Sequence, residues 1–327
     1  MNIISKKASI AINNSRLLFV IAIVCLHCRI DQDVKPTEIR WFIQYCCNFN
    51  ISNDFVCHLI HPVVPSLFIL SGYLFFSNMK ERFGWNEYIY KIKKRVKSLL
   101  IPYLIWSIIG LIAIFYIYKK ETPSLLYVIK AFTINPEGVL WYIRDLMLLA
   151  ILAPVYYFIV KKIKLGGIII LYIITDSIFE NTYIPILNLN YLLGAAIAIN
   201  KISIENVLKI IDYKLCLIIY FILKIMSVYS QIQYNISILP ILLLIGILGL
   251  NMDIQPKFKD AGFSTFLFFS HIYIKGIKSL LTKFIPINTD LGCLTLLLIR
   301  IFGTVMLSWI LYKIIPKKVR PILIGGR

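Results

Sequence analysis

The segment Arg16-Leu-Leu-Phe-Val-Ile-Ala-Ile-Val-Cys-Leu-His27 decides the fold class of this 327-residue chain. Only apolar residues stand between its two ionisable ends, and the segment lies within a longer, largely apolar stretch at 10–30. A helix that crosses a lipid bilayer needs about 20 mainly apolar residues. The stretch therefore predicts a transmembrane helix.

The composition of the whole chain supports the same class. Hydrophobic residues make up 59% of it and charged residues only 16%, whereas about 25% charged residues is usual for soluble proteins. One core could not enclose so many apolar side chains, which excludes a cytosolic enzyme with an ordinary polar surface. The 20 Phe, 20 Tyr and 5 Trp exclude a disordered chain. We expect an integral membrane protein.

Ten segments are candidate spans. They cover residues 10–30, 57–77, 99–118, 139–160, 165–180, 184–200, 214–230, 232–250, 261–282 and 291–315. None alternates apolar and polar residues as the strands of a membrane barrel do, so each is predicted to be a helix. The predicted fold is an all-α bundle of about ten transmembrane helices. Residues 1–327 are expected to form one membrane domain with no appended soluble domain.

The charges predict an orientation. Lys and Arg outnumber Asp and Glu by 35 to 16, which gives a net charge of +19. They are concentrated, by roughly three to one, in the loops on the side of the two termini, and membrane proteins keep such loops in the cytoplasm. Both termini are therefore predicted to be cytoplasmic and the number of spans even. Because no basic soluble domain is present, nucleic acid is not an expected partner.

Arg16 and His27 are ionisable groups inside the first predicted span, where such groups are costly and often functional. Eleven residues turn a helix by about three turns, so both side chains lie on one face, about 16 Å apart along the axis. The predicted topology places Arg16 toward the cytoplasm and His27 toward the outer side. The structural alternative is that Arg16 extends to the inner headgroups and His27 caps the helix.

Four more motifs stand in order along the chain. They are Val64-Pro-Ser-Leu-Phe-Ile-Leu-Ser-Gly-Tyr73, Leu100-Ile-Pro-Tyr-Leu-Ile-Trp106, Leu140-Trp-Tyr-Ile-Arg-Asp-Leu146 and Phe269-Ser-His-Ile-Tyr273. With the Arg-x10-His spacing of the first span, they resemble the motifs of the acyltransferase-3 family, membrane O-acyltransferases that modify bacterial glycans. The resemblance implies a multi-pass protein of the bacterial inner membrane. It also implies transfer of an acyl group, usually acetyl, from cytoplasmic acyl-CoA to a hydroxyl of a glycan or lipid-linked sugar.

The resemblance and the chemistry assign roles to individual residues. Neutral imidazole can accept the hydroxyl proton or carry the acyl group, which makes His27 the catalytic candidate. Arg16 is expected to be the second catalytic residue and is suited to the phosphates of CoA. Trp141 and Tyr142 are suited to the acceptor sugar. Further candidates are Arg144 and Lys275 for the donor, and Ser71, His61 and His271 for the acceptor. No metal is expected.

Some assignments have structural alternatives. The basic stretch Lys91–Lys97, expected in the loop 78–98, either sets topology and contacts anionic lipid or captures CoA phosphates. Ser71 is either a nucleophile or, with Gly72, part of a close helix contact. Arg144 and Asp145 diverge by about 100° on a helix, so we expect one of them to pair with another helix rather than with its neighbour. The partners available for that pairing are Lys224, Asp176 and Arg300.

The chain departs from the family pattern shortly before the motif that begins at Val64, where His58 and His61 stand in place of an Arg found in many members. A histidine is not a permanent cation. Cys46, Cys47 and Cys57 either form one disulfide or stay free thiols.

Two other function classes compete with the enzyme. A transporter or flippase for a sugar or small acid would also have intramembrane charges, and a non-catalytic assembly subunit is the third class. The ordered motifs favour the acyltransferase. The expected partners are the lipid bilayer, acyl-CoA and the acceptor, with a homo-oligomer left open.

Overall fold

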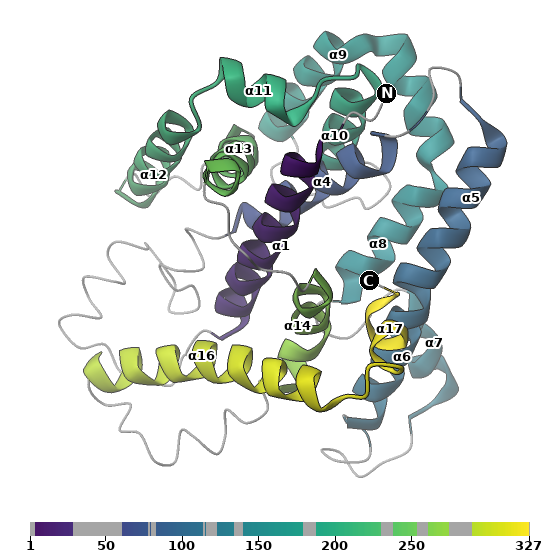
Figure 1. Cartoon of the computed structure of the whole chain (residues 1–327), viewed down its shortest axis with the longest axis vertical. Coiled ribbons are helices and arrows are strands. Elements are labelled where there is room, and N and C mark those ends of the chain that lie inside the picture. The colour runs from purple at the N-terminus through teal and green to yellow at the C-terminus, as the bar shows by residue number, and fades with distance from the viewer. Residues whose placement is uncertain are drawn as a thin grey trace.

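The computed structural model describes residues 4–28, 61–77, 79, 83–113, 115, 123–133, 140–178, 188–229, 238–253, 261–274 and 290–326. In these residues every regular element is a helix, and no strand occurs. The helices are α1 (Lys6–His27), α4 (Val63–Phe76), α5 (Trp85–Arg95), the π-helix η1 (Val96–Leu100), α6 (Ile101–Ile112), α7 (Leu125–Thr133), α8 (Leu140–Ile151), α9 (Ala153–Ile178), α10 (Leu189–Ile199), α11 (Ile204–Ile210), α12 (Tyr213–Tyr229), α13 (Ile238–Asp253), α14 (Ala261–Ile274), α16 (Asp290–Ile314) and α17 (Arg320–Ile324) (Figure 1). The all-α class is confirmed.

Several helices are long and apolar enough to cross a membrane. Within the described part of the chain these are Lys6–His27, Trp85–Ile112 and Thr295–Ile314. The bent pairs Leu140–Ile151 with Ala153–Tyr172 and Leu189–Ile199 with Ile204–Ile210 raise the number to five if each pair is one span. These helices identify a membrane protein, while the count of ten and the orientation of the termini stay predictions.

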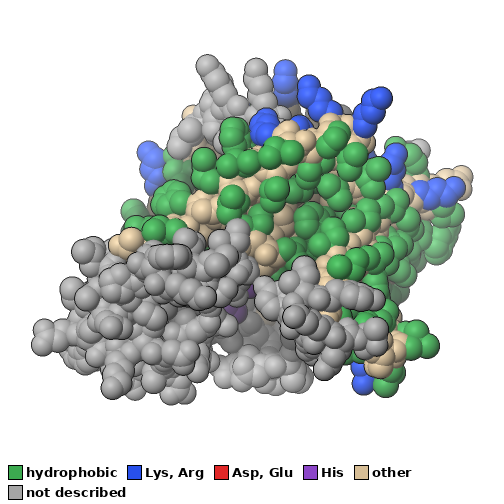
Figure 2. Space-filling model, turned by 90° about the horizontal axis from the view of Figure 1, so that it is seen from below, with side chains coloured by type: hydrophobic (Ala, Val, Ile, Leu, Met, Phe, Trp, Pro, Cys, Tyr) green, Lys and Arg blue, Asp and Glu red, His purple; other side chains and the backbone are tan. Residues whose placement is uncertain are grey.

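Helix α16 has the surface pattern of a membrane helix. It buries Arg300, Thr304 and Ser308, each at most 6% exposed, and turns Phe302 and Met306 outward. A helix of a soluble protein does the reverse, because water favours polar side chains outside. On the face in Figure 2 hydrophobic side chains cover most of the described surface, and Lys and Arg gather along its upper edge.

The basic stretch Lys91–Lys97, expected in a loop, is helical. Helices α5, η1 and α6 run on without a break, so the span predicted to begin at residue 99 is the second half of a longer helix (Figure 1). Lys and Arg have high helix propensities, so a run of positive charge does not by itself end a helix. The π-helical turn η1 stands just before Pro102, whose ring nitrogen cannot donate to the carbonyl of Ser98.

Two breaks shape the segment from α8 to α9. The first bends the pair by 64°, just before Pro154, which has no N–H to donate to a carbonyl in α8. The hydroxyl of Tyr88 donates to the carbonyl oxygen of Ile151 at this bend, over 2.8 Å. The second break is Lys164, with φ of 62°, which falls at the predicted boundary between the spans 139–160 and 165–180.

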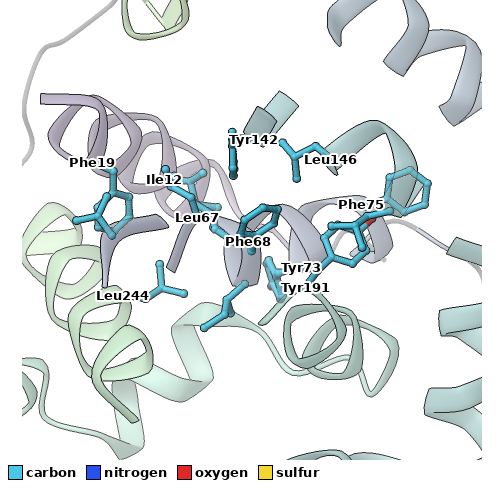
Figure 3. Packing of buried hydrophobic residues seen from close by; sticks show 14 of the residues in the cluster. Ile12, Phe19, Leu67, Phe68, Tyr73, Phe75, Tyr142, Leu146, Tyr191 and Leu244 are labelled. Atoms are coloured by element: carbon cyan, nitrogen blue, oxygen red, sulfur yellow. The ribbon is translucent and has the colours of Figure 1, made fainter. Parts of the chain in front are cut away.

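Helix α4 lies at the centre of the core. It packs against α1, α8, α10 and α13, and Figure 3 shows its Phe68 facing Tyr142 of α8. The contact with α10 is the closest, because a Cβ on Gly194 would overlap the carbonyl of Ile69 and lie 2.8 Å from the nitrogen of Tyr73. Gly72 is similarly close to α10. The close-packing interpretation of Ser71-Gly72 is therefore confirmed for the glycine.

Candidate functional site

Arg16 points into the helix bundle. Its side chain is half-buried, and it lies close enough to Tyr142 of α8 and Arg95 of α5 to interact with both electrostatically. Arg95 also lies within electrostatic range of Tyr191 on α10. Arg16 and Arg95 therefore form the positive part of the site, within electrostatic range of each other.

His27 is the last residue of α1, and its ring is held by the helix itself. The Nδ1 atom lies 2.8 Å from the carbonyl oxygen of Ile23. A carbonyl only accepts hydrogen bonds, so Nδ1 carries the proton and Nε2 has the lone pair. In a helix the Ile23 carbonyl already receives the backbone N–H of His27. The imidazole bond therefore orients the ring and is not needed to cap the helix.

His271 of α14 lies beside His27. The two ring centroids are 5.2 Å apart, with planes at 57°. The Nδ1 atom of His271 lies 2.7 Å from the carbonyl oxygen of Phe268 and 3.1 Å from that of Leu267. His271 thus has the same protonated nitrogen as His27, and it is only 1% exposed. Two imidazoles, each oriented by an Nδ1 bond to its own helix, meet where α1 and α14 pack together.

Tyr142 connects the positive part of the site to the histidines. Its hydroxyl lies 3.1 Å from Oγ of Ser71, and its ring packs edge-on against Phe68 at 4.8 Å (Figure 3). It also contacts Phe268 at 5.7 Å, and Phe268 lies 6.2 Å from His271. Ring contacts therefore lead from Tyr142 through Phe268 to the two imidazoles, and Arg16 lies within electrostatic range of Tyr142.

Trp141 and Ser71 lie at the edge of this series. The indole of Trp141 is partly exposed and lies 6.4 Å from Phe68. The hydroxyl of Ser71 contacts a phenol, whereas a serine nucleophile needs an adjacent base such as an imidazole. The contact therefore favours a binding or packing role for Ser71.

Helix α16 supports the two histidine-bearing helices from behind. In Figure 1 it runs across the end of α1 that carries His27. Its Thr304 hydroxyl lies 3.8 Å from the sulfur of Cys28, and its Ser308 hydroxyl lies 3.0 Å from that of Ser270. Cys28 and Ser270 are chain neighbours of the two histidines, so the buried polar side of α16 fixes the distance between them.

The basic stretch divides into two faces, which sequence reasoning missed. Lys93, Lys94 and Lys97 are exposed. Lys91 and Arg95 are half-buried and turn toward α4, where Lys91 donates to the carbonyl of Phe75 over 2.6 Å. The spacing of four residues between Lys91 and Arg95 was the available signal, since such residues share a helix face.

The arrangement of Arg144 and Asp145 corrects one expectation. The guanidinium of Arg144 pairs with its neighbour Asp145 at 2.7 Å, and its Nη1 donates to the carbonyl of Thr133 on α7 over 3.4 Å. The prediction that the adjacent residues cannot pair was wrong. The angle of about 100° applies where side chains leave the helix, but the long arginine side chain bends back to the completely buried carboxylate.

The remaining candidates lie elsewhere. His61 is exposed just before α4 and lies within electrostatic range of the buried Lys224. Five of them lie outside the described residues: Lys275, His58, Cys46, Cys47 and Cys57. Among the residues the structure describes, no three His, Cys, Asp or Glu side chains lie close enough to hold a metal ion.

Comparison with known proteins gives one match. A family model described as an acyltransferase domain matches residues 9–313. Neither a curated protein nor a solved structure matches the chain. The matched residues include Arg16, Tyr142, Phe268 and the two histidines.

Proposed function

The chain belongs to the acyltransferase family whose domain spans residues 9–313, and from this premise we propose that it is a membrane O-acyltransferase using acyl-CoA. The proposed donor is acetyl-CoA, which binds from the cytoplasmic side. The acceptor is a hydroxyl of a cell-surface glycan or lipid-linked sugar at a bacterial inner membrane. The observation that carries the proposal is the series Arg16, Tyr142, His271 and His27, assembled from three helices.

Arg16 and Arg95 hold the donor in this proposal. The two guanidinium groups repel each other, so a doubly charged anion is a favourable ligand. Arginine binds phosphate through two parallel hydrogen bonds. The half-buried position of both residues fits the phosphates of CoA, while the exposed Lys93, Lys94 and Lys97 suit anionic headgroups.

His27 performs the chemistry. Its Nδ1 proton is held by the carbonyl of Ile23, so Nε2 is the atom that accepts a proton or attacks the thioester carbonyl. Trp141 and Tyr142 contact the acceptor sugar, Trp141 through its partly exposed ring and Tyr142 through its hydroxyl. Ser71, bonded to that hydroxyl, positions it.

Mass spectrometry of surface glycans tests the proposal. Cells that carry the chain are expected to add one acyl group per glycan repeat, and cells without it none. His27→Ala should remove the mass difference, because general-base catalysis contributes about 10²–10⁴-fold. Accumulation of an untransported sugar intermediate in cells without the chain would instead identify a flippase. Normal acylation by a well-expressed His27→Ala variant would refute the assignment of His27.

A further inference from the structure

Tyr191 of α10 has a buried hydroxyl group that packing does not explain. The side chain is only 2% exposed, and its ring packs against those of Tyr156 at 5.7 Å and Phe76 at 6.3 Å (Figure 3 shows Tyr191 within the buried cluster around α4). A phenylalanine would make the same ring contacts. The hydroxyl has no hydrogen-bond partner among the residues that the structure describes, and a buried polar group without a partner is costly. The hydroxyl is therefore expected to bind a ligand.

The surroundings of this hydroxyl are positively charged. Arg95 of α5 lies within electrostatic range of Tyr191, and Arg16 of α1 lies within electrostatic range of Arg95. The guanidinium of Arg95 lies over the buried ring of Phe75, 5.6 Å from its centroid, so it is turned toward α4. A ligand that binds between Arg95 and Tyr191 therefore meets a positive charge and a hydroxyl donor together.

Tyr73 of α4 shows that a buried tyrosine can have the opposite surroundings. Its hydroxyl lies near the backbone of Ile204 and within electrostatic range of Glu205. A negative ligand would be repelled there by the carboxylate. Tyr191 has the cation Arg95 in range instead, so the ligand that suits its hydroxyl is an anion.

We propose that the hydroxyl of Tyr191 donates a hydrogen bond to the diphosphate of the acyl-CoA donor, so that Tyr191 binds the donor together with Arg16 and Arg95. The inference rests on the proposed acyltransferase function and concerns the same site. A hydrogen bond to an anionic oxygen is roughly twice as strong as one between neutral groups. Tyr191 makes and breaks no covalent bond in this role and positions the donor.

The charges and the burial favour the diphosphate over the other phosphate of CoA. Each half of the diphosphate carries one negative charge, so each can pair with one of the two guanidinium groups. The hydroxyl of Tyr191 binds a further oxygen without adding a third positive charge. The 3′-phosphate stands on the ribose at the end of the donor, where it can remain in water, whereas Tyr191 is almost completely buried.

The length of the donor agrees with this placement. About 13 bonds join the diphosphate of CoA to its sulfur, and an extended chain of that length spans about 15 Å. Arg16 and His27 share a face of α1 and lie about 16 Å apart along its axis. A diphosphate bound beside Arg16 therefore leaves the thioester within reach of His27.

Tyr191→Phe tests the proposal, because it removes the hydroxyl and keeps the ring. Tyr103→Phe is the matched control. Tyr103 is also 2% exposed, but its hydroxyl donates to the carbonyl oxygen of Phe132 over 2.8 Å. The full chain is purified in detergent, and its melting temperature is measured without ligand. Calorimetric titration then measures the affinity for acetyl-CoA and for dephospho-CoA, which keeps the diphosphate and lacks the 3′-phosphate.

The two variants are expected to differ in opposite directions. Tyr191→Phe should lower the affinity for both probes about 10–100-fold, the usual effect of losing a hydrogen bond to a charged group. Its melting temperature should equal or exceed that of the wild type, because the ligand-free protein loses a buried hydroxyl without a partner. Tyr103→Phe should melt about 2–4 °C below the wild type and bind both probes within about threefold of it.

Three results would overturn the proposal. The first is an unchanged affinity of Tyr191→Phe for both probes. The second is a melting temperature of Tyr191→Phe as low as that of Tyr103→Phe, or failure of Tyr191→Phe to fold, because the hydroxyl would then have a partner within the protein. The third is a loss confined to acetyl-CoA with dephospho-CoA unchanged, which would assign the hydroxyl to the 3′-phosphate.

The failure of the underlying function has a different signature. A wild-type chain that binds neither acetyl-CoA nor dephospho-CoA refutes the acyl-CoA donor, and the role of Tyr191 with it. A wild-type chain that binds both probes no more tightly than Tyr191→Phe refutes the role of Tyr191 and leaves the proposed function intact.

Discussion

Gly194→Ala tests whether the contact between α4 and α10 positions the site. A Cβ at residue 194 would overlap the carbonyl oxygen of Ile69 and lie 2.8 Å from the backbone nitrogen of Tyr73, while real Cβ atoms essentially never approach within 3.0 Å. Both atoms belong to the backbone, so no side chain can rotate away and α4 must shift. Overpacking of this kind costs about 1–3 kcal/mol, and the better helix propensity of Ala returns at most about 1 kcal/mol.

Gly303→Ala is the matched control. Residue 303 is also a helical glycine, but a Cβ there would meet nothing within 4 Å. This variant gains helix propensity without a clash and is expected to be neutral or more stable by up to about 1 kcal/mol. The comparison therefore separates the general effect of replacing a helical glycine from the effect of the close contact.

The assay is thermal unfolding of the purified full chain in detergent, followed by glycan acylation in cells. At about 2–4 °C per kcal/mol for a large domain, Gly194→Ala should melt several degrees below Gly303→Ala. Because a shift of α4 also moves Ser71 from its 3.1 Å contact with Tyr142, acylation should fall with it. A melting temperature of Gly194→Ala equal to or above that of Gly303→Ala would contradict the packing argument.

Three further predictions concern the donor and the membrane. Arg16→Ala should weaken acyl-CoA binding, whereas His27→Ala should leave it intact. Arg16→Lys should restore binding only in part. An equal loss of melting temperature in the two alanine variants would indicate a structural role instead. Arg95→Ala should lower the affinity for acyl-CoA about tenfold or more, and the control Lys94→Ala less than about threefold. Calorimetric titration measures both affinities. Equal affinities of the two variants would show that Arg95 does not bind the donor. A reporter fused within residues 31–56 should report the outer side and one at the C-terminus the cytoplasm; a cytoplasmic signal from the first would reverse the predicted orientation.

The sequence by itself determined the class of fold and the geometry of the first span. Apolar runs of about 20 residues form helices in a bilayer because no other open structure satisfies the backbone there. The shared face of Arg16 and His27 likewise follows from helix periodicity, which is a local property. The family membership was accessible for the same reason, since each motif is a short segment read in order along the chain.

Local rules were less successful where side-chain length or helix continuity mattered. The stretch Lys91–Lys97 was expected to be a loop because it is charged, although helix formation depends on backbone hydrogen bonds that charge does not prevent. Arg144 and Asp145 were expected to stay apart, because the angle between their Cβ positions was taken to set the distance between their charged ends. The structure shows that a long side chain overrides that angle.

Only the tertiary structure decided which residues meet. Nothing in the sequence places His271 beside His27, or identifies α4 as the helix that Arg95 faces. Each depends on the packing of helices that lie far apart along the chain, and periodicity fixes only the face on which a residue lies. Which helix that face meets is decided by the packing of the whole bundle, including the two glycines that bring α4 and α10 together.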